Sequence, residues 1–133
     1  MGIVKANQNF TIQMAIINLE TGNFANPDLS YFAAPQQLNP EGQITGHSHF
    51  VIQEITSINQ TVPIDPRKFA FFTAVNKAAV NGVVSEVVTG GLPVGTYKLS
   101  SINTATNHQP VVVPVAQHGS LDDAIYVSCS MIF

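Results

Sequence analysis

The sequence has little charge, one cysteine and no tryptophan. Charged residues make up 10% of its 133 residues, and only five are Lys or Arg, for a net charge of −3. Nucleic acid and anionic membranes are bound by clustered cations, so neither partner is expected. The single cysteine, Cys129, excludes an internal disulfide and any zinc site that needs several cysteines. Its apolar strand neighbours, Ile125 and Val127, predict a buried and unreactive thiol.

The chain also lacks long apolar runs. None approaches the ~20 residues that a membrane-spanning helix requires, so no membrane insertion is expected. No cationic start followed by an apolar stretch marks a signal peptide at the N-terminus. The compartment is left open, with the outside of the cell favoured. Asn9 and Asn59 each begin a tripeptide of the glycosylation type, which matters only for a secreted chain.

Apolar residues are plentiful, at 45% of the sequence, so uncharged polar residues must supply most of the polar surface. Such a weakly charged surface protects poorly against association. We therefore expect a homo-oligomer, with a dimer as the simplest case. A monomer with a merely neutral surface is the alternative.

The apolar pattern has the two-residue period of β-strands. Phe10, Ile12, Met14 and Ile16 alternate with polar residues and predict a first strand. Further strands are predicted at residues 42–57, 83–88, 96–102, 111–115 and 124–133, with short ones near 31–33 and after a helical turn within 65–72. About seven strands without a long helical pattern predict an all-β fold, a single-domain antiparallel β-sandwich or small barrel over residues 1–133.

Histidines carry the main chemical signal. His47 and His49 lie on the same face of a predicted strand, while His108 and His118 flank the run 111–115. If that run pairs with the first histidine strand, three or four imidazoles converge into a site for Zn or Cu. Carboxylates that could join them are Glu54, Asp122 and Asp123.

The competing interpretation is that these histidines brace loops by bonding to backbone carbonyls. The sequence does not decide between the two interpretations. Because Phe50 and Ile52 mark the other strand face as the apolar one, we expect replacement of His47 and His49 to cost little stability in the absence of a metal.

Catalytic patterns are weak. Ser120, His118 and Asp122 offer the residue types of a triad, but such triads assemble from distant segments. No Gly-x-Ser-x-Gly turn, phosphate loop or dinucleotide fingerprint is present. No catalytic residue is assigned, and a protein without enzymatic activity is favoured.

Binding through loops is a second possibility. Residues 22–42 form a long irregular connection rich in Pro, Gly, Asn and Gln, a candidate wall for a ligand site. Exposed tyrosines among amide side chains suit a carbohydrate, although the lack of tryptophan lowers the odds. The candidate ligand-binding residues are Tyr31, Tyr97, Asn107, Gln117 and Asp122. The alternative is that the tyrosines anchor corners of the sheet.

The spacing His47-x-His49 followed by Glu54 resembles the first motif of the cupins, small barrels that hold a metal with two histidines, a glutamate and a later histidine. The chain departs from that pattern, because no glycine follows Glu54 at the expected distance and Lys98 takes the place of the later histidine. Glu54 would also lie on the strand face opposite His49 unless a bulge intervened.

Several segments together resemble a largely uncharacterised group of small proteins from mushroom-forming fungi, sometimes labelled as a ribosomal protein. These segments are residues 46–49, 68–72, 90–97, 107–110 and 116–123. The resemblance implies a fungal origin and supplies no catalytic residues. Similar small fungal β-proteins include lectins, defence proteins and immunomodulatory proteins, an analogy at the level of fold.

Two functional hypotheses follow, with a purely structural role as a third. The first is a non-enzymatic fungal protein, dimeric, that recognises a glycan or a cell-surface protein through its loops. The second is a metalloprotein, conceivably an enzyme, with its site at His47, His49, His108 and His118.

Overall fold

The computed structural model describes residues 1–131. Its elements are β1 (Gly2–Lys5), β2 (Phe10–Ala15), β3 (Leu19–Glu20), α1 (Pro27–Ser30), β4 (Ile44–Ile55), β5 (Phe71–Val75), β6 (Val83–Val88), β7 (Gly95–Ala105) and β8 (Ala124–Ser130). The protein is therefore almost entirely β, which confirms the predicted fold class. Among the described residues, no helix is long and apolar enough to cross a membrane.

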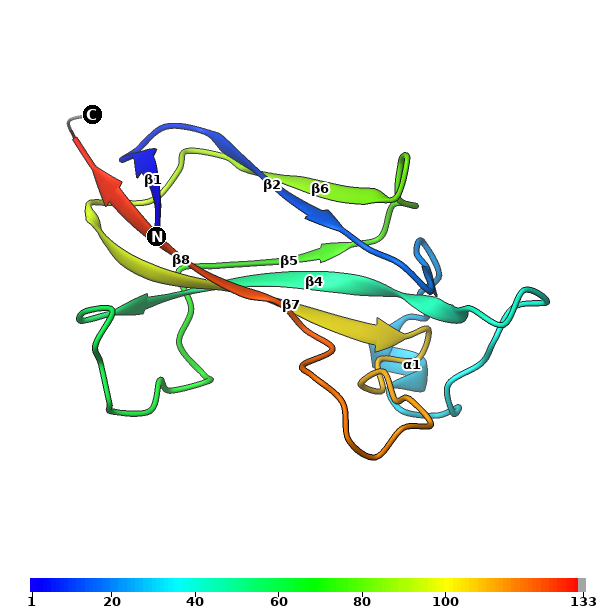
Figure 1. Cartoon of the computed structure of the whole chain (residues 1–133). Coiled ribbons are helices and arrows are strands. Elements are labelled where there is room, and N and C mark those ends of the chain that lie inside the picture. Colours follow the sequence, from blue (N-terminus) through cyan, green and yellow to red (C-terminus); the bar gives the residue numbers. More distant parts are fainter. Residues whose placement is uncertain (132–133) are drawn as a thin grey trace.

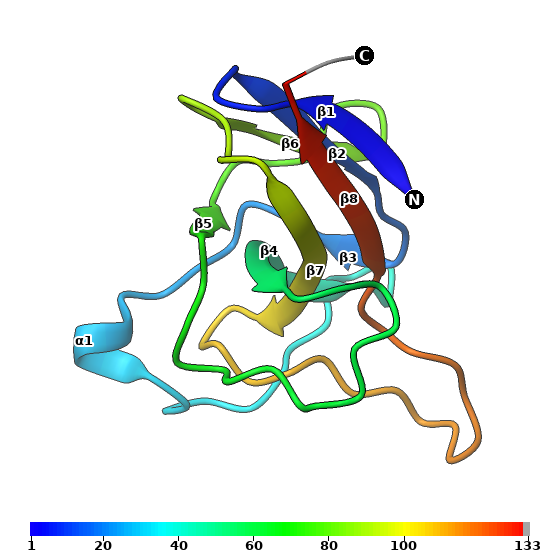
Figure 2. The same cartoon turned by 90° about the vertical axis from the view of Figure 1, so that its left-hand side faces the viewer.

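The strands form two sheets (Figures 1 and 2). A curled sheet has the order β1-β8-β7-β4-β3, with β5 also paired to β4, and a separate sheet consists of β2 and β6. Most pairings are antiparallel, but β1 runs parallel to β8 and β3 runs parallel to β4. The long central pair β4 and β7 keeps an unbroken register from Gly46 opposite Ala105 to Ile55 opposite Thr96.

The core lies between the two sheets. Phe50 and Ile52 of β4 are almost completely buried there, together with Cys129 of β8. Side chains of the small sheet, including Val84 and Val88, cover them from the other side. Burial of each large apolar side chain contributes roughly 1.5–3 kcal/mol. The alternation along β4 thus gives the apolar face that the sequence predicts, and the thiol of Cys129 is buried as expected.

The opposite face of β4 and β7 is covered by loops. α1 and the connection that follows β7 lie on this side, away from β2 and β6 (Figure 1). Backbone hydrogen bonds attach the long loop to β4 and to the turn after β7, among them Asn23 N to Gly46 O (3.0 Å), Ala25 N to Thr106 O (2.9 Å) and Phe32 N to Asn107 O (2.9 Å). The loop predicted as the wall of a ligand site therefore covers the face that carries His47 and His49.

Several predicted elements differ from the structure. The short strand near residues 31–33 is absent, because the one-turn helix α1 precedes it and Phe32 has a left-handed φ of 57°. Residues 111–115 form no strand; only Pro110 makes an isolated bridge, to Thr104. Pro110 and Pro114 have no N–H to donate to a ladder, which explains the interruption. β1 and β3 were not predicted, since neither is long enough to show an alternation.

Candidate metal centre

His47 and His49 lie side by side on β4, as the strand period predicts. Their ring centroids are 4.9 Å apart. His47 is opposite Thr104 of β7, and His49 is opposite Ile102. The face that they share looks away from the core and toward the covering loops.

His108 reaches the same point from the turn that ends β7. His108 N donates to Ala105 O (2.9 Å), and Ala105 N donates to Gln109 O (2.8 Å), which closes a three-residue hairpin loop. His108 has a left-handed φ of 70°, a conformation uncommon in residues other than glycine, although His, Asn and Asp adopt it more often than most. Its ring centroid lies 4.6 Å from that of His47 and 5.6 Å from that of His49.

Together His47, His49 and His108 form a cluster in which one ring nitrogen of each lies within 4.8 Å of the others. Nitrogens bound to one tetrahedral ion at 2.0–2.1 Å are about 3.3 Å apart. Closing the cluster around an ion therefore requires modest ring rotations and no change of the backbone pairing.

Hydrogen bonding assigns the tautomer of His47. His47 Nδ1 is 2.9 Å from Asn23 O, and since a carbonyl only accepts, this nitrogen carries the proton of the neutral ring. The lone pair of His47 then lies on Nε2, with the Thr104 hydroxyl 3.3 Å away. His49 Nε2 and His108 Nδ1 are buried without a hydrogen-bond partner. Buried polar atoms without partners are rare in native structures, so these two nitrogens are the candidate ligands of the cluster.

The cluster is electrically neutral at neutral pH. Burial, followed by the neighbouring His47 and His108, lowers the pKa of His49 to about 4. Burial also lowers the pKa of His108. It lowers the pKa of His47 as well, although the bond of that ring to the Asn23 carbonyl acts in the opposite direction. Metal ligands must be deprotonated, so the three imidazoles are ready to bind without losing a proton.

Aromatic rings surround the cluster. Phe24 makes an edge contact with His47 (6.1 Å between centroids), and Phe72 makes one with His49 (5.3 Å). Tyr31 lies 5.8 Å from His108. Two of these rings come from the long loop, which contains α1, and one comes from β5, so two separate segments lie against the site.

The other predicted ligands lie elsewhere. His118 is exposed, its Nδ1 lies 2.6 Å from the neighbouring Gly119 O, and it is not part of the cluster. Glu54 lies on the opposite face of β4 from His49, because the register with β7 has no bulge. Among residues 1–131, no carboxylate joins the three histidines in the cluster.

The acidic pair and the triad candidate have local roles. Asp122 accepts hydrogen bonds from Asn103 N (2.7 Å) and from the hydroxyl of Ser101 (3.3 Å). Ser120 donates its hydroxyl to the backbone carbonyl of Asp122 (2.6 Å). The hydroxyl therefore forms part of a turn and does not bond a catalytic base. These contacts fasten the segment before β8 to β7.

The predicted ligand-binding residues are not gathered in one surface feature. Tyr31 is 59% exposed and stacks on Phe32, with centroids 4.2 Å apart. Tyr97 is only 2% exposed and donates its hydroxyl to Pro93 O (3.0 Å), so it anchors the core and cannot stack on a sugar. Asn107 accepts from Phe32 N through its carbonyl, and Gln117 is exposed in the loop before β8.

Sequence reasoning missed Asn23, Thr104 and the enclosing aromatics Phe24 and Phe72. The contact of His47 with Asn23 uses a backbone carbonyl, which any residue type would supply. No residue pattern could therefore have identified it. Thr104 lies opposite His47 in the pairing of β7 with β4. The alternation along β7 could have placed it there only if that pairing had been known.

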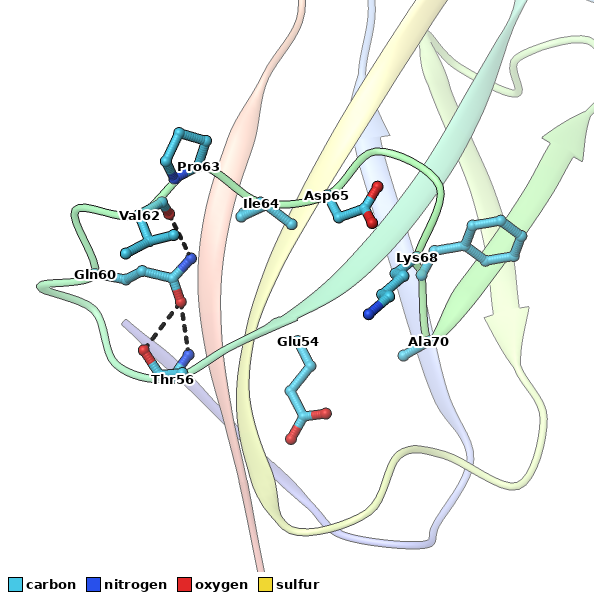
Figure 3. Close-up of a pocket in the computed structure, with 10 residues that line it drawn as sticks. Glu54, Thr56, Gln60, Val62, Pro63, Ile64, Asp65, Lys68 and Ala70 are labelled. Atoms are coloured by element: carbon cyan, nitrogen blue, oxygen red, sulfur yellow. Dashed lines mark hydrogen bonds between the residues drawn. The ribbon is translucent and has the colours of Figure 1, made fainter.

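A separate hollow of about 490 Å³ lies at the other end of β4 (Figure 3). Its lining combines the charged side chains of Glu54 and Lys68 with an apolar floor. Gln60 shapes its wall, accepting from Thr56 N and donating to Val62 O. The hollow contains none of the histidines, so it does not coincide with the strongest chemical signal.

Comparisons with known proteins agree with a fungal origin. A family profile described as "CLU5d N-terminal domain" matches residues 1–130. "Pathogenicity cluster 5 protein d" of Colletotrichum graminicola is 41% identical over 124 residues, which are 92% of this chain and 26% of that protein. The chain thus spans about a quarter of the length of this relative. No solved structure matches the chain.

These matches support the fungal relationship that the sequence resemblance implied, but neither the narrower group of mushroom-forming fungi nor the cupin motif. Because the profile covers nearly all of the sequence, the chain belongs to the CLU5d N-terminal domain family.

Proposed function

We propose that this domain binds one transition-metal ion, Zn or Cu, through His47, His49 and His108. The observation that carries the proposal is the pair of buried ring nitrogens without a hydrogen-bond partner, His49 Nε2 and His108 Nδ1, in a cluster to which His47 adds a third imidazole. Each unsatisfied buried group costs about 1–3 kcal/mol, which coordination to an ion would offset.

The competing role, bracing of loops, accounts for the cluster less well. His47 does bond a loop carbonyl, that of Asn23. A bracing histidine needs such a partner, and the buried nitrogens of His49 and His108 have none. Two of the three histidines thus make no bracing bond through these buried nitrogens.

The relative from Colletotrichum graminicola is a much longer protein whose name assigns it to a pathogenicity cluster. We infer that the metal-binding domain serves within a fungal protein of that kind.

The test uses untagged protein purified without chelating resin. Elemental analysis is expected to find one equivalent of Zn or Cu after incubation with the ions and desalting. An ion at about a hundredfold excess over its Kd stabilises by ~2.7 kcal/mol, which raises Tm by about 5–10 °C. His49→Ala should abolish both the ion and the rise in Tm.

Two further variants serve as controls. His118→Ala should retain the ion, because His118 lies outside the cluster. His108→Asn removes the imidazole but keeps a residue that tolerates the left-handed backbone, so its loss of metal would not reflect a misfolded turn. Absence of metal in the unaltered protein, or loss of it in His118→Ala, would refute the proposal.

A second candidate function is recognition of a glycan or a protein by the long loop. The observation in its favour is the exposed, stacked pair Tyr31 and Phe32, since exposed rings are common platforms for sugars and partner proteins. Binding to a glycan array that disappears in Tyr31→Ala but persists in Tyr126→Ala would support it. Equal binding by both variants would exclude this loop as the recognition surface.

A further inference from the structure

We propose that the ion held by His47, His49 and His108 is monovalent copper, bound by three nitrogens without a fourth ligand. This inference rests on the proposed metal-binding function and adds the identity, charge and coordination number of the ion. It is argued from the donor set, the enclosure of the site and the charge that the site can accommodate.

The donor set consists of three neutral imidazoles. Zn²⁺ in proteins is almost always four-coordinate, with a thiolate, a carboxylate or a water beside its histidines. Within residues 1–131 no carboxylate or thiolate belongs to the cluster. Cys129 lies in the core between the sheets, on the other side of the curled sheet. The hydroxyl of Thr104 lies 3.3 Å from His47 Nε2, but a neutral hydroxyl is a poor ligand for zinc.

The enclosure leaves little room for a water ligand. His47 has no exposed surface, and the free nitrogens of His49 and His108 are buried. Phe24, Tyr31 and Phe72 present carbon edges or faces around the rings. Cu²⁺ favours tetragonal sites completed by oxygen or nitrogen ligands, which this arrangement does not supply. A three-coordinate ion with a filled d shell fits the enclosure after the ring rotations described above.

The cost of burying the charge of the ion also favours monovalent copper. The Born cost of burying an ion rises with the square of its charge, so a monovalent ion is penalised about fourfold less than a divalent one. A buried cation is normally offset by a paired anion, and the three ligands here bring no charge. The Asn23 carbonyl on His47 Nδ1 adds only a dipole, which raises the basicity of that ligand.

The experiment is an anaerobic titration of the full chain with Cu⁺, competed against bicinchoninate, with parallel titrations of Zn²⁺ and Cu²⁺. X-ray absorption of the Cu⁺ form then gives the number and type of ligands. We expect one Cu⁺ per chain, three nitrogen scatterers without a fourth light atom, and binding at least about tenfold tighter than that of either divalent ion. His108→Asn should lose the third scatterer and His118→Ala should keep it.

The outcomes separate this inference from the function on which it rests. A four-coordinate spectrum, or Zn²⁺ bound as tightly as Cu⁺, would overturn the assignment to copper(I) while leaving a metal-binding domain. Failure to bind any of the three ions would overturn both. None of these readings depends on a variant that might fail to fold, because the decisive spectra come from the unaltered chain.

Discussion

Gly46 fixes the distance between the two strands that hold the cluster. A Cβ atom at this position would fall 1.9 Å from Thr104 O and 2.9 Å from Thr104 C, a clash with backbone that cannot rotate away. Gly46 also precedes His47, and its carbonyl accepts from Asn23 N. Glycine is therefore required here for close approach of the chains.

We predict that Gly46→Ala destabilises the domain by about 2–4 kcal/mol and removes the metal site, since β4 and β7 must move apart. Urea unfolding and metal titration measure the two effects. Gly119→Ala is the matched control, because a Cβ there meets nothing within 4 Å. Equal stability of the two variants would contradict the packing described for Gly46.

His47 and His49 should respond differently to replacement. The strand pattern led us to expect a small loss of stability for both, because the apolar face of β4 is the other one. In the structure the loops bury His47 completely, and its Nδ1 bonds the Asn23 carbonyl. His49 has a buried nitrogen without a partner, so its removal also relieves a penalty.

In the presence of a chelator, His47→Ala should cost about 2–4 kcal/mol and His49→Ala less than half of that. Thermal or urea unfolding of the metal-free variants gives the comparison. A larger loss for His49→Ala would mean that its ring makes a stabilising contact that its unpartnered nitrogen does not reveal.

The lowered pKa of His49 predicts acid sensitivity of the metal-free protein. Its pKa is about 4 in the folded state against 6.5 in an ordinary environment, so between these values the unfolded chain binds a proton that the folded chain does not. Stability should fall as the pH drops through this window, by up to roughly 3 kcal/mol from this residue. Urea unfolding at several pH values measures the slope, which should flatten in His49→Gln and stay unchanged in His118→Ala.

The long loop is fastened to the turn after β7 by a reciprocal contact. Gln36 Nε2 donates to Val112 O (3.0 Å), and Val112 N donates to Gln36 Oε1 (2.9 Å). These bonds join segments 76 residues apart, on the side of the sheet that holds the histidines. The loop that carries Phe24 and Tyr31 therefore has an attachment of its own beyond its backbone bonds to the sheet.

We predict that Gln36→Ala lets this loop open more often. The amides of Ala25 and Phe32, which bond across to residues 106 and 107, should exchange their hydrogens about tenfold faster. Release of a bound ion to a chelator should accelerate in parallel. Gln37→Ala is the control, because the Gln37 side chain bonds only the nearby Pro35 carbonyl. Unchanged exchange in Gln36→Ala would show that the backbone bonds alone hold the loop.

Strands with regular alternation were predictable, and elements that depend on a partner were not. The period of two located β2, β4, β7 and β8 to within a few residues, and a β-branched run after the Asn81-Gly82 turn located β6. The same period placed His47 and His49 on one face. β1 and β3 carry no signal of their own, because their formation depends on β8 and β4, respectively.

The third histidine shows where inference from sequence stops. His108 was a candidate ligand, but the expected route was strand pairing of residues 111–115. The structure uses a left-handed turn after β7 instead, and turn geometry of this kind is set by backbone bonds to Ala105 and Gln109. From its residue type, His118 was an equally good candidate ligand. Only the fold shows that His108 belongs to the cluster and His118 does not.

The chain should behave as one cooperative unit. The core joins side chains from β2, β4, β6 and β8, so neither sheet buries its apolar face without the other. The assignment of residues 1–133 to a single domain remains a prediction, and calorimetry tests it: the calorimetric and van't Hoff enthalpies of unfolding should agree. Two separate transitions would contradict it. The expected homo-oligomer also remains a prediction, to be measured by sedimentation.

The parallel pairing of β1 with β8 has a consequence for the order of events during synthesis. Residues 2–5 find their sheet partners only at residues 127–130, although β3, β5 and β7 can pair with β4 before then. At 5–20 residues per second, a ribosome needs about 6–25 s to make the intervening chain. During that interval the histidine strands can pair and the turn can close, while the first strand waits. The nascent domain thus brings its three clustered histidines together before its outer edge is complete.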